Sequence, residues 1–357
     1  MKIAQVAPLY ESVPPKLYGG TERVVSYLTE ELVRQGHEVT LFASGDSETS
    51  ARLIPACPQS LRLNPTCVDQ IAHHYVMLED VRERASEFDV VHFHVDYLHF
   101  PLSRLLGLPQ LTTLHGRLDL ADLVPLYRKF PDMPVVSISH SQRKPLDWIN
   151  WAGNVYHGLP EDLLKAGDGG GNYLAFLGRI SPEKRVDRVI EIAVKLGMPL
   201  KIAAKIDKAD RDYYETSIKH LMNHPLVEYI GEIREDQKSE FLGNALAYLF
   251  PIDWQEPFGL TMIESMACGT PTVAFNSGSV REVLAHGKTG FLVKSVPEAI
   301  EAVKRVAELS RKACRQEFED RFTAPRMAAD YVKLYQTIVS AGSSVEITEV
   351  DDSCLTL

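Results

Sequence analysis

Two glutamates and the helix start between them carry the strongest chemical signal in this sequence. The stretch EPFGLTMIESMACGTPTVA places Glu256 in a turn and Glu264 inside a predicted helix, with seven residues between them. Because the first turn of a helix leaves backbone N–H groups unpaired, Phe258, Gly259 and Leu260 can donate to an anion or to a hydroxyl-rich ligand. We therefore predict that both carboxylates face one ligand, Glu256 at the mouth of the site and Glu264 deeper inside.

A simpler interpretation of this stretch is purely structural. Glu256 would then complement the helix dipole, and Glu264 would lie on a solvated face of the helix. The neighbours of Glu264 argue against that interpretation, because Met262, Ile263 and Met266 are apolar and are expected to be buried.

Two cations are predicted at the end of a strand in the second half of the chain. Arg179 ends a predicted strand and Lys184 lies in the helix start that follows, so both emerge at the sheet edge where ligands bind. Opposite unit charges about 4 Å apart attract by ~1 kcal/mol in water and by ~4 kcal/mol at an effective dielectric of about 20. Both cations could therefore stabilise a departing diphosphate. The alternative is a solvated helix start in which they pair with Glu183 or Asp187.

The first half of the chain contributes a glycine pair and a histidine. Gly19 and Gly20 precede a predicted helix and let a phosphate approach the backbone closely, although alone they indicate only a turn. His115 follows a predicted strand, and its ring is expected to project into a cleft at the sheet edge. The alternative for His115 is a loop histidine with one local hydrogen bond. His140 and His157, at later strand ends, have weaker claims.

A short alternating run superficially resembles a set of metal ligands. His92, His94 and Asp96 would share one face of a strand end, with His99 nearby. We expect no metal there, because imidazoles at such a strand end more often hydrogen-bond to polar ligands or to neighbouring backbone. Asp207 follows a strand and precedes a helical run, which is the usual place for an N-cap.

Taken together, these motifs resemble the retaining glycosyltransferases of family 4, which have the GT-B fold: α/β, with two Rossmann-like domains facing across a cleft. The resemblance rests on the E-x7-E stretch, the glycine pair, the histidine of TLHG and the LGR…EK run, and it extends over nearly the whole chain. Two features depart from the family pattern. Arg185 stands where the family usually has glycine, and AAKID at 203–207 replaces a commoner glycine-rich loop.

The resemblance implies roles for the candidate residues. The two cations would hold the diphosphate of the donor, His115 would contact the donor sugar, and the base would be recognised near residues 229–233. We assign to catalysis His115, Glu256, Arg179 and Lys184. We assign to donor binding Gly19, Gly20, Arg179, Lys184, Gly231, Phe258, Gly259, Leu260 and Glu264.

The resemblance also implies a reaction. A sugar would move from a nucleotide diphosphate sugar to an unidentified acceptor with its anomeric configuration retained, by a front-face mechanism without a metal or another cofactor. A UDP-sugar is favoured, and GDP- and ADP-sugars stay open. The alternatives are a sugar-nucleotide-binding protein without activity, an epimerase, and a phosphorylase that carries an aldehyde cofactor on a lysine.

Composition excludes several other classes of protein. The chain has 357 residues, of which 45% are hydrophobic and 24% charged, as expected for a globular protein with two cores. Its formal net charge of −10 argues against broad contact with nucleic acid or an anionic membrane. Five cysteines without paired spacing favour a reducing compartment. With no apparent signal peptide or membrane span, we predict a cytoplasmic protein, and leave peripheral membrane contact and oligomeric state open.

Short β-rich runs alternate with helical stretches in both halves, which predicts two parallel sheets. An amphipathic helix is expected from Thr21 to about Arg34. The first half should contain strands at 3–6, 39–42, 90–93, 111–114, 135–138 and 155–156. The second half should contain strands at 174–177, 200–203, 227–230, 247–250, 272–275 and 291–293.

These patterns suggest the boundaries of the two domains. We predict an acceptor-side domain at 1–165 and a nucleotide-sugar domain at 172–322, with an unpacked glycine-rich hinge just before Tyr173. By resemblance, an amphipathic helix at about 324–340 crosses back onto the first domain. The tail at 343–357 holds four acids and no base and is expected to be disordered.

Overall fold

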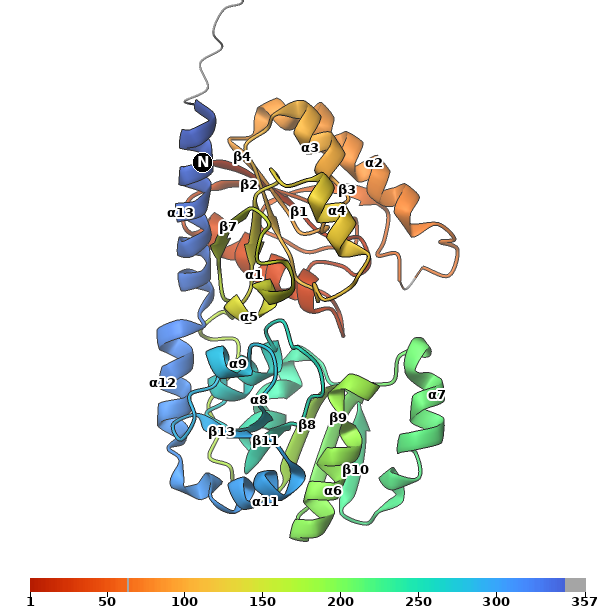
Figure 1. Ribbon diagram of the computed structural model, residues 1–357, viewed down its shortest axis with the longest axis vertical. Coiled ribbons are helices and arrows are strands. Elements are labelled where there is room, and N and C mark those ends of the chain that lie inside the picture. The colour runs from red at the N-terminus through yellow and green to blue at the C-terminus, as the bar shows by residue number, and fades with distance from the viewer. Residues whose placement is uncertain (63, 344–357) are drawn as a thin grey trace, which may run out of the picture.

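The computed structural model describes residues 1–62 and 64–343. Two parallel sheets, each surrounded by helices, form two domains that lie one above the other in Figure 1. The first sheet is built from strands between residues 2 and 154, and the second from strands between residues 174 and 293. The prediction of two Rossmann-like domains is confirmed. Of the tail at 343–357, predicted to be disordered, Ser343 is the last residue of a helix, and residues 344–357 lie outside the described residues.

The first sheet has seven strands in the order β3-β2-β1-β4-β5-β6-β7, and every pairing is parallel. The order changes direction between β1 and β4, which is the switch point where ligands of such sheets bind. The strands are β1 Lys2–Val6, β2 Glu38–Ser44, β3 Arg52–Cys57, β4 Val90–Phe93, β5 Gln110–Thr113, β6 Val135–Ser137 and β7 Trp151–Asn154. The helical segments are α1 Gly20–Arg34, α2 Gln70–Glu83, η1 Ala85–Glu87, α3 Phe100–Leu106, α4 Leu123–Lys129, α5 His140–Arg143 and η2 Lys144–Leu146.

Two predictions for this sheet were wrong. Strand β3 was missed because it is an edge strand that contains Pro55, and proline is tolerated at an edge since it need not donate to a neighbour. The last strand, β7, ends at Asn154, just before the predicted segment 155–156. Helix α1 matches its prediction, and Gly36, with φ of +85°, follows its end.

The second sheet has six strands in the order β10-β9-β8-β11-β12-β13, again all parallel, with its switch point between β8 and β11. All six predicted strands are present. They are β8 Leu174–Arg179, β9 Leu200–Lys205, β10 Val227–Gly231, β11 Ala247–Phe250, β12 Thr272–Phe275 and β13 Gly290–Val293. The helical segments are η3 Pro182–Lys184, α6 Val186–Leu196, η4 Lys208–Asp210, α7 Arg211–Tyr213, η5 Tyr214–Ile218, η6 Leu221–Asn223, α8 Glu235–Gly243, α9 Leu260–Ala267, α10 Val280–Val283, α11 Val296–Lys304, η7 Val306–Glu308 and α12 Arg311–Arg321.

The glycine run before Tyr173 is packed, contrary to the prediction of an unpacked hinge. The amide of Gly167 donates to the carbonyl of Cys268 at 3.0 Å, and the amide of Gly169 donates to the carbonyl of Gly243 at 3.0 Å. A Cβ atom on Gly167 would lie only 2.3 Å from the carbonyl oxygen of Gly243. These glycines therefore allow two backbone segments to touch, and they fasten the run to the second domain.

The chain crosses between the domains twice, and the crossings lie side by side. Leu159 and Thr323 form a parallel β-bridge, with the amide of Leu159 donating to the carbonyl of Phe322 at 2.9 Å. After the second crossing, helix α13 (Ala324–Ser343) runs along the first domain, as Figure 1 shows. It contacts α1, β4 and β5 and buries Tyr331 and Tyr335 completely.

Candidate active site

A cavity of about 520 Å³ lies between the two domains. It is lined from the first domain by the loop before α1 and by the ends of the central strands, and from the second domain by the ends of β8, β9 and β11 and the start of α9. Of the residues predicted from the sequence, the lining includes Gly19, Gly20, His115, Arg179, Lys184, Glu256, Phe258, Gly259, Leu260 and Glu264. Gly231 is absent from the lining, although Glu232 and Ile233, the next two residues, are part of it.

Two helix starts face each other across this cavity. Gly20 is the first residue of α1 and Leu260 the first of α9, and a Cβ atom on Gly20 would lie 3.6 Å from Cδ1 of Leu260. Gly259 caps α9 with φ of +85°, a conformation that favours glycine, and an added Cβ atom would also meet Cε of Met262 at 2.7 Å. Two positive helix ends that converge in this way favour an anion between them.

The predicted cations both lie at the second-domain edge of the cavity, each beside a carboxylate. Arg179 donates to Glu183 at 2.6 Å, and its Nε lies 3.2 Å from Oδ2 of Asp210. Lys184 donates to Oε2 of Glu256 at 2.5 Å. The alternative partner expected for Arg179, Glu183, is therefore present, whereas Lys184 pairs with neither Glu183 nor Asp187. Instead, Lys184 joins the two parts of the predicted site directly.

Glu256 is enclosed by its partner Lys184 and by the aromatic side chain of Trp254. Nε1 of Trp254 donates to the same Oε2 atom at 3.0 Å, and the ammonium of Lys184 lies 5.0 Å from the centre of a Trp254 ring. Glu256 is 7% exposed. A carboxylate with these two donors on one oxygen keeps its other oxygen, Oε1, for a further partner.

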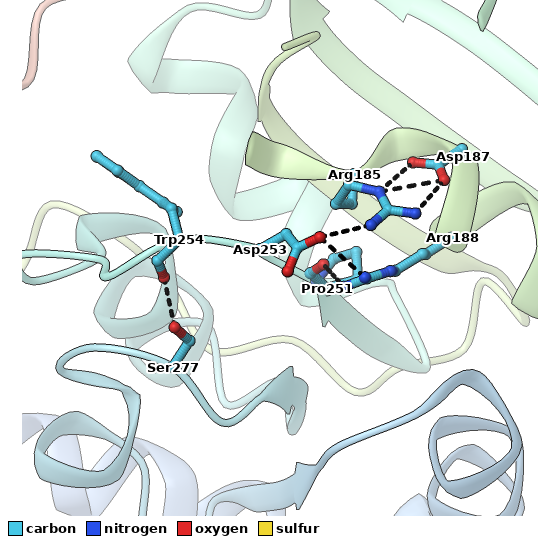
Figure 2. A network of polar contacts seen from close by, with 7 residues as sticks. All are labelled: Arg185, Asp187, Arg188, Pro251, Asp253, Trp254 and Ser277. Atoms are coloured by element: carbon cyan, nitrogen blue, oxygen red, sulfur yellow. Dashed lines mark hydrogen bonds and ion pairs between the residues drawn. The ribbon is translucent and has the colours of Figure 1, made fainter. Parts of the chain in front are cut away.

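The loop that carries Glu256 is tied to the start of α6, as Figure 2 shows. Asp253 accepts hydrogen bonds from Arg185 at 2.6 Å and Arg188 at 3.0 Å, while Ser277 donates to the carbonyl of Trp254 at 2.6 Å. Arg185 has φ of +53°, in the left-handed region. That conformation explains why a glycine is usual at this position in the family it resembles. Here the arginine also pairs with Asp187 at 2.7 Å, so its side chain helps to hold the loop.

Glu264 lies deeper than Glu256 and belongs to an ion network that links the domains. Its Oε1 accepts from Lys238 at 2.7 Å, and Lys238 also donates to Glu235 at 3.0 Å. Glu235 pairs with Arg23, which extends from α1 of the first domain. Glu264 is 2% exposed, and among the described residues its buried Oε2 atom has no hydrogen-bond partner. An orphaned buried carboxylate oxygen in a cavity is suited to accept a ligand hydroxyl.

His115 lines the first-domain side of the cavity. Its Nε2 lies 2.9 Å from Nδ1 of His94, and its ring stacks on that of His157 with centres 5.3 Å apart. His157 in turn meets the ring of Phe258 edge-on at 4.9 Å, which brings a second-domain residue against the histidine pair. Burial lowers the pKa of His115 to about 3, so its imidazole is neutral at physiological pH. His157 lines the cavity too, whereas His140 binds Glu282 through its amide at 2.7 Å.

The alternating histidines serve as hydrogen-bonding groups in the interior. His92 lies 2.7 Å from Tyr335 and 2.7 Å from Thr113, and His94 lies 2.8 Å from Gln5. All four ring nitrogens of His92 and His94 thus have protein partners. Among the described residues, no group of three or more His, Cys, Asp or Glu side chains is arranged to hold a metal ion.

Four charged residues on the first-domain side of the cavity were not assigned to the site from the sequence. They are Glu22, Arg23, Arg62 and Asp96, the last having been considered only as a metal ligand. Burial raises the pKa of Glu22 to about 7 and that of Asp96 to about 6. Asp96 also has φ of +49°, a strained conformation of the kind that clusters at functional sites. The strand end after His94 was the available signal for Asp96, and no local signal pointed to Arg62.

Comparison with known proteins adds the family to this geometry. The profile named Glycosyltransferase Family 4 matches residues 18–155, and the profile named Glycosyl transferases group 1 matches residues 165–323. An uncharacterised glycosyltransferase of Methanocaldococcus jannaschii is 25% identical, over 82% of this chain and 85% of its own length. The phosphatidyl-myo-inositol mannosyltransferase of Mycolicibacterium smegmatis is 23% identical, over 98% of this chain and 97% of its own length.

A solved structure extends the likeness to the fold. HepE of Anabaena, crystallised with UDP-glucose, superposes with a TM-score of 0.71 at 17% identity, covering 97% of this chain and 100% of its own. The two matched profiles together span both sheets and the cavity between them. From the paired Rossmann-like domains, the E-x7-E helix start and these matches, the chain belongs to the family 4, group 1 glycosyltransferases and has the GT-B fold.

Proposed function

We propose that this protein transfers a hexosyl group from a UDP-sugar to a hydroxyl of an acceptor, with retention of the anomeric configuration and without a divalent ion. The observation that carries the proposal is the convergence, in one interdomain cavity, of Arg179, Lys184 and the α9 helix start opposite His115. Such an arrangement can stabilise a leaving diphosphate from one side while the sugar is held from the other.

The described contacts support one orientation for the donor. The diphosphate would lie between the starts of α1 and α9, within reach of Arg179 and Lys184. The ribose would donate to Oε2 of Glu264, the buried oxygen without a protein partner. The base would lie near Glu232 and Ile233, and the sugar would extend toward His115. This orientation leaves the first-domain carboxyls for the acceptor.

In the transfer step the bond between the anomeric carbon and the β-phosphate oxygen breaks, and a bond from that carbon to the acceptor oxygen forms on the same face. The proton of the acceptor hydroxyl moves to the departing phosphate oxygen, and the nucleoside diphosphate leaves. Negative charge grows on the diphosphate, where the cations are, while positive charge grows at the anomeric carbon. Glu256 would stabilise the positive charge, because its Oε1 stays open beside Lys184.

The choice of uridine is supported by HepE, which was solved with UDP-glucose, and GDP- and ADP-sugars are the competing donors. A thermal-shift panel of UDP, GDP and ADP, each with and without its glucose conjugate, tests the base. We expect the UDP compounds to raise the melting temperature most. A larger shift with GDP or ADP would replace the uridine proposal while leaving the transferase proposal intact.

The proposal that transfer needs no metal ion rests on the positive charges of Arg179 and Lys184. Turnover of the identified donor should be undiminished in excess EDTA, and NMR of the product should find the donor's anomeric configuration. Loss of activity that only Mg²⁺ or Mn²⁺ restores would contradict the proposal.

An Arg179→Ala or Lys184→Ala change should lower turnover by about 10²–10³, as for other lost preorganised donors. Normal turnover in either variant would remove that residue from the site.

The same assay separates the competing functions. A binding protein without activity would bind the donor and leave it intact. An epimerase would change the sugar in the absence of acceptor, and a phosphorylase would show the absorbance of its lysine-bound aldehyde. Family membership favours the transferase.

A further inference from the structure

A buried line of hydrogen bonds runs from helix α13 to His115, and the transfer step described above does not use it. Nε2 of Gln5 donates to the hydroxyl of Tyr335 at 3.1 Å, and Oε1 of Gln5 lies 2.8 Å from Nε2 of His94. Nδ1 of His94 lies 2.9 Å from Nε2 of His115. Gln5 and Tyr335 are 0% exposed and His94 is 2% exposed, whereas His115, at the end of the line, is partly exposed where it lines the cavity.

The hydrogens on this line can be assigned from Gln5 outward. Its Oε1 can only accept, so Nε2 of His94 carries the hydrogen. A neutral imidazole has one N–H, which makes Nδ1 of His94 an acceptor and Nε2 of His115 the donor to it. Both rings are neutral, because burial lowers the pKa of His94 well below its ordinary value and that of His115 to about 3. Nδ1 of His115 is then left with a lone pair.

A second branch continues the same order of donors from the Gln5 amide. The Tyr335 hydroxyl, having accepted from Gln5, donates to Nδ1 of His92 at 2.7 Å. Nε2 of His92 then donates to Thr113 at 2.7 Å. If the Gln5 amide were reversed, every donor on both branches would have to reverse with it, including the one on His115.

We propose that Gln5, held by Tyr335, is a positioning residue that keeps the proton of His115 on Nε2 and so presents Nδ1 as an acceptor for a hydroxyl of the bound sugar. His115 lines the cavity, and no described residue hydrogen-bonds to its Nδ1. Gln5 is not part of the lining and acts only through His94. The sugar as ligand rests on the proposed function, whereas the position of the proton does not.

The tautomer can be read directly in the unliganded protein. In full-length protein labelled with [15N]histidine at pH 7.5, two-bond 15N–1H correlation spectra distinguish a protonated ring nitrogen from one with a lone pair. The His115 signals are identified by their absence in His115→Gln. We expect a protonated Nε2 and an unprotonated Nδ1. A hydrogen on Nδ1 of His115 would overturn the proposal.

Two tyrosines on the same helix provide a matched pair of variants. Tyr335→Phe removes the partner of Gln5, frees the amide to reverse and should yield both tautomers of His115. Tyr331→Phe removes an equally buried hydroxyl that bonds to Thr113 at 2.8 Å, and should leave the single tautomer. A single His115 tautomer in both variants would remove Tyr335 from this role.

Two substitutions of Gln5 provide a second test if Tyr335→Phe does not fold. Gln5→Glu retains an acceptor for His94 and should preserve the tautomer, whereas Gln5→Met should lose it. Turnover of UDP-glucose should fall about 3- to 10-fold in Gln5→Met, the effect of one neutral hydrogen bond, with smaller changes in KM for the donor and in UDP affinity. A tautomer that survives in Gln5→Met contradicts the proposal. If the wild-type protein does not turn over any nucleotide sugar, the proposed function fails, and the spectra still decide the position of the proton.

Discussion

Each of the two glutamates that dominate the sequence has a lysine partner, and the partners give them different chemistry. Glu256 pairs with Lys184, which is also a candidate ligand of the diphosphate. Lys184 can therefore exchange between the carboxylate and the phosphate. Glu264 is paired with Lys238, an interior residue, and keeps one buried oxygen without a partner. The two carboxylates should therefore respond differently to the same substitution.

Glu264→Gln should weaken UDP binding, because the ribose would lose charge-assisted hydrogen bonds of about 1.5–3 kcal/mol each. Glu256→Gln should leave UDP binding nearly unchanged and lower turnover, since its interaction matters where positive charge develops. Calorimetric titration with UDP, set beside the turnover rates, measures both effects. If Glu256→Gln loses UDP affinity and Glu264→Gln retains it, the two assignments are reversed.

A second prediction at this scale concerns the buried histidine His99. It lies 2.7 Å from both Ser103 and Thr112 and stacks on Phe93, and burial lowers its pKa to about 3. Below the unfolded value near 6.5, the unfolded chain binds a proton that the folded chain does not. The free energy of unfolding should therefore fall as pH falls from about 6.5 toward 3, by up to about 1.4 kcal/mol per pH unit from this residue.

Urea unfolding of wild type and His99→Gln at steps between pH 4 and 8.5 tests this dependence. The variant should be less stable at pH 8, where it has lost buried contacts, but its stability should fall less steeply below pH 6.5. Above that pH the two curves should run parallel. Equal slopes between pH 4 and 6 would mean that His99 is protonated in the folded protein.

At the scale of the element, the start of α9 depends on a single backbone conformation. Gly259 has φ of +85° and leaves room for Glu256 and Met262, whose atoms would lie 3.5 Å and 2.7 Å from an added Cβ. Because the left-handed region costs an ordinary residue about 1–2 kcal/mol, the strain alone is moderate. The crowding must be relieved by a shift of the Met262 side chain or of the helix start at which the diphosphate is proposed to bind.

Gly259→Ala should therefore lower UDP affinity as well as stability. Gly36→Ala is the matched control, because Gly36 has the same φ of +85° with nothing within 4 Å of an added Cβ. That control should lose a similar amount of backbone stability and keep its UDP affinity. Melting temperatures and calorimetric titrations of the two variants make the comparison, and equal UDP affinities would remove the α9 start from the phosphate site.

At the scale of the whole molecule, polar contacts connect the domains on more than one side of the cavity. Ser139 donates to the carbonyl of Pro257 at 2.6 Å, and the amides of His140 and Ser141 donate to Glu282 at 2.7 and 2.6 Å. The Arg23–Glu235 ion pair makes a separate connection, and through Lys238 it reaches Glu264. Domain closure and the proposed ribose contact thus share one ion network.

Arg23→Met should open the unliganded molecule, because Glu235 would keep no partner on the opposite domain. Small-angle scattering should record a larger radius of gyration, and UDP should bind more weakly. Arg34→Met, at the other end of α1, is the control, since Arg34 pairs with Glu31 inside the first domain. Equal radii of gyration for both variants and the wild type would show that the pair does not hold the domains together.

None of the helices in residues 1–62 and 64–343 is long and apolar enough to cross a membrane. The cytoplasmic location stays a prediction from the composition of the chain.

The sequence by itself determined the alternation of strands and helices, the Rossmann-like domains and the local motifs around Gly20, Arg179 and Glu256. These are features of short segments, in which periodicity, glycine and helix-start residues act through neighbours in the chain. Strand β3 and the glycine run before Tyr173 were misjudged because an edge position and a close backbone approach depend on segments far away in sequence.

Only the tertiary structure decided those partners of the site residues that are distant in the sequence. Lys238 with Glu264, Arg23 with Glu235, and Tyr335 with Gln5 are separated by 26, 212 and 330 positions, and no local pattern links them. A buried charge or ring nitrogen must find a partner wherever packing supplies one, and packing is a property of the whole fold. The sequence could therefore identify the candidate groups of the site, while the folded chain supplied their hydrogen-bond partners and counter-ions.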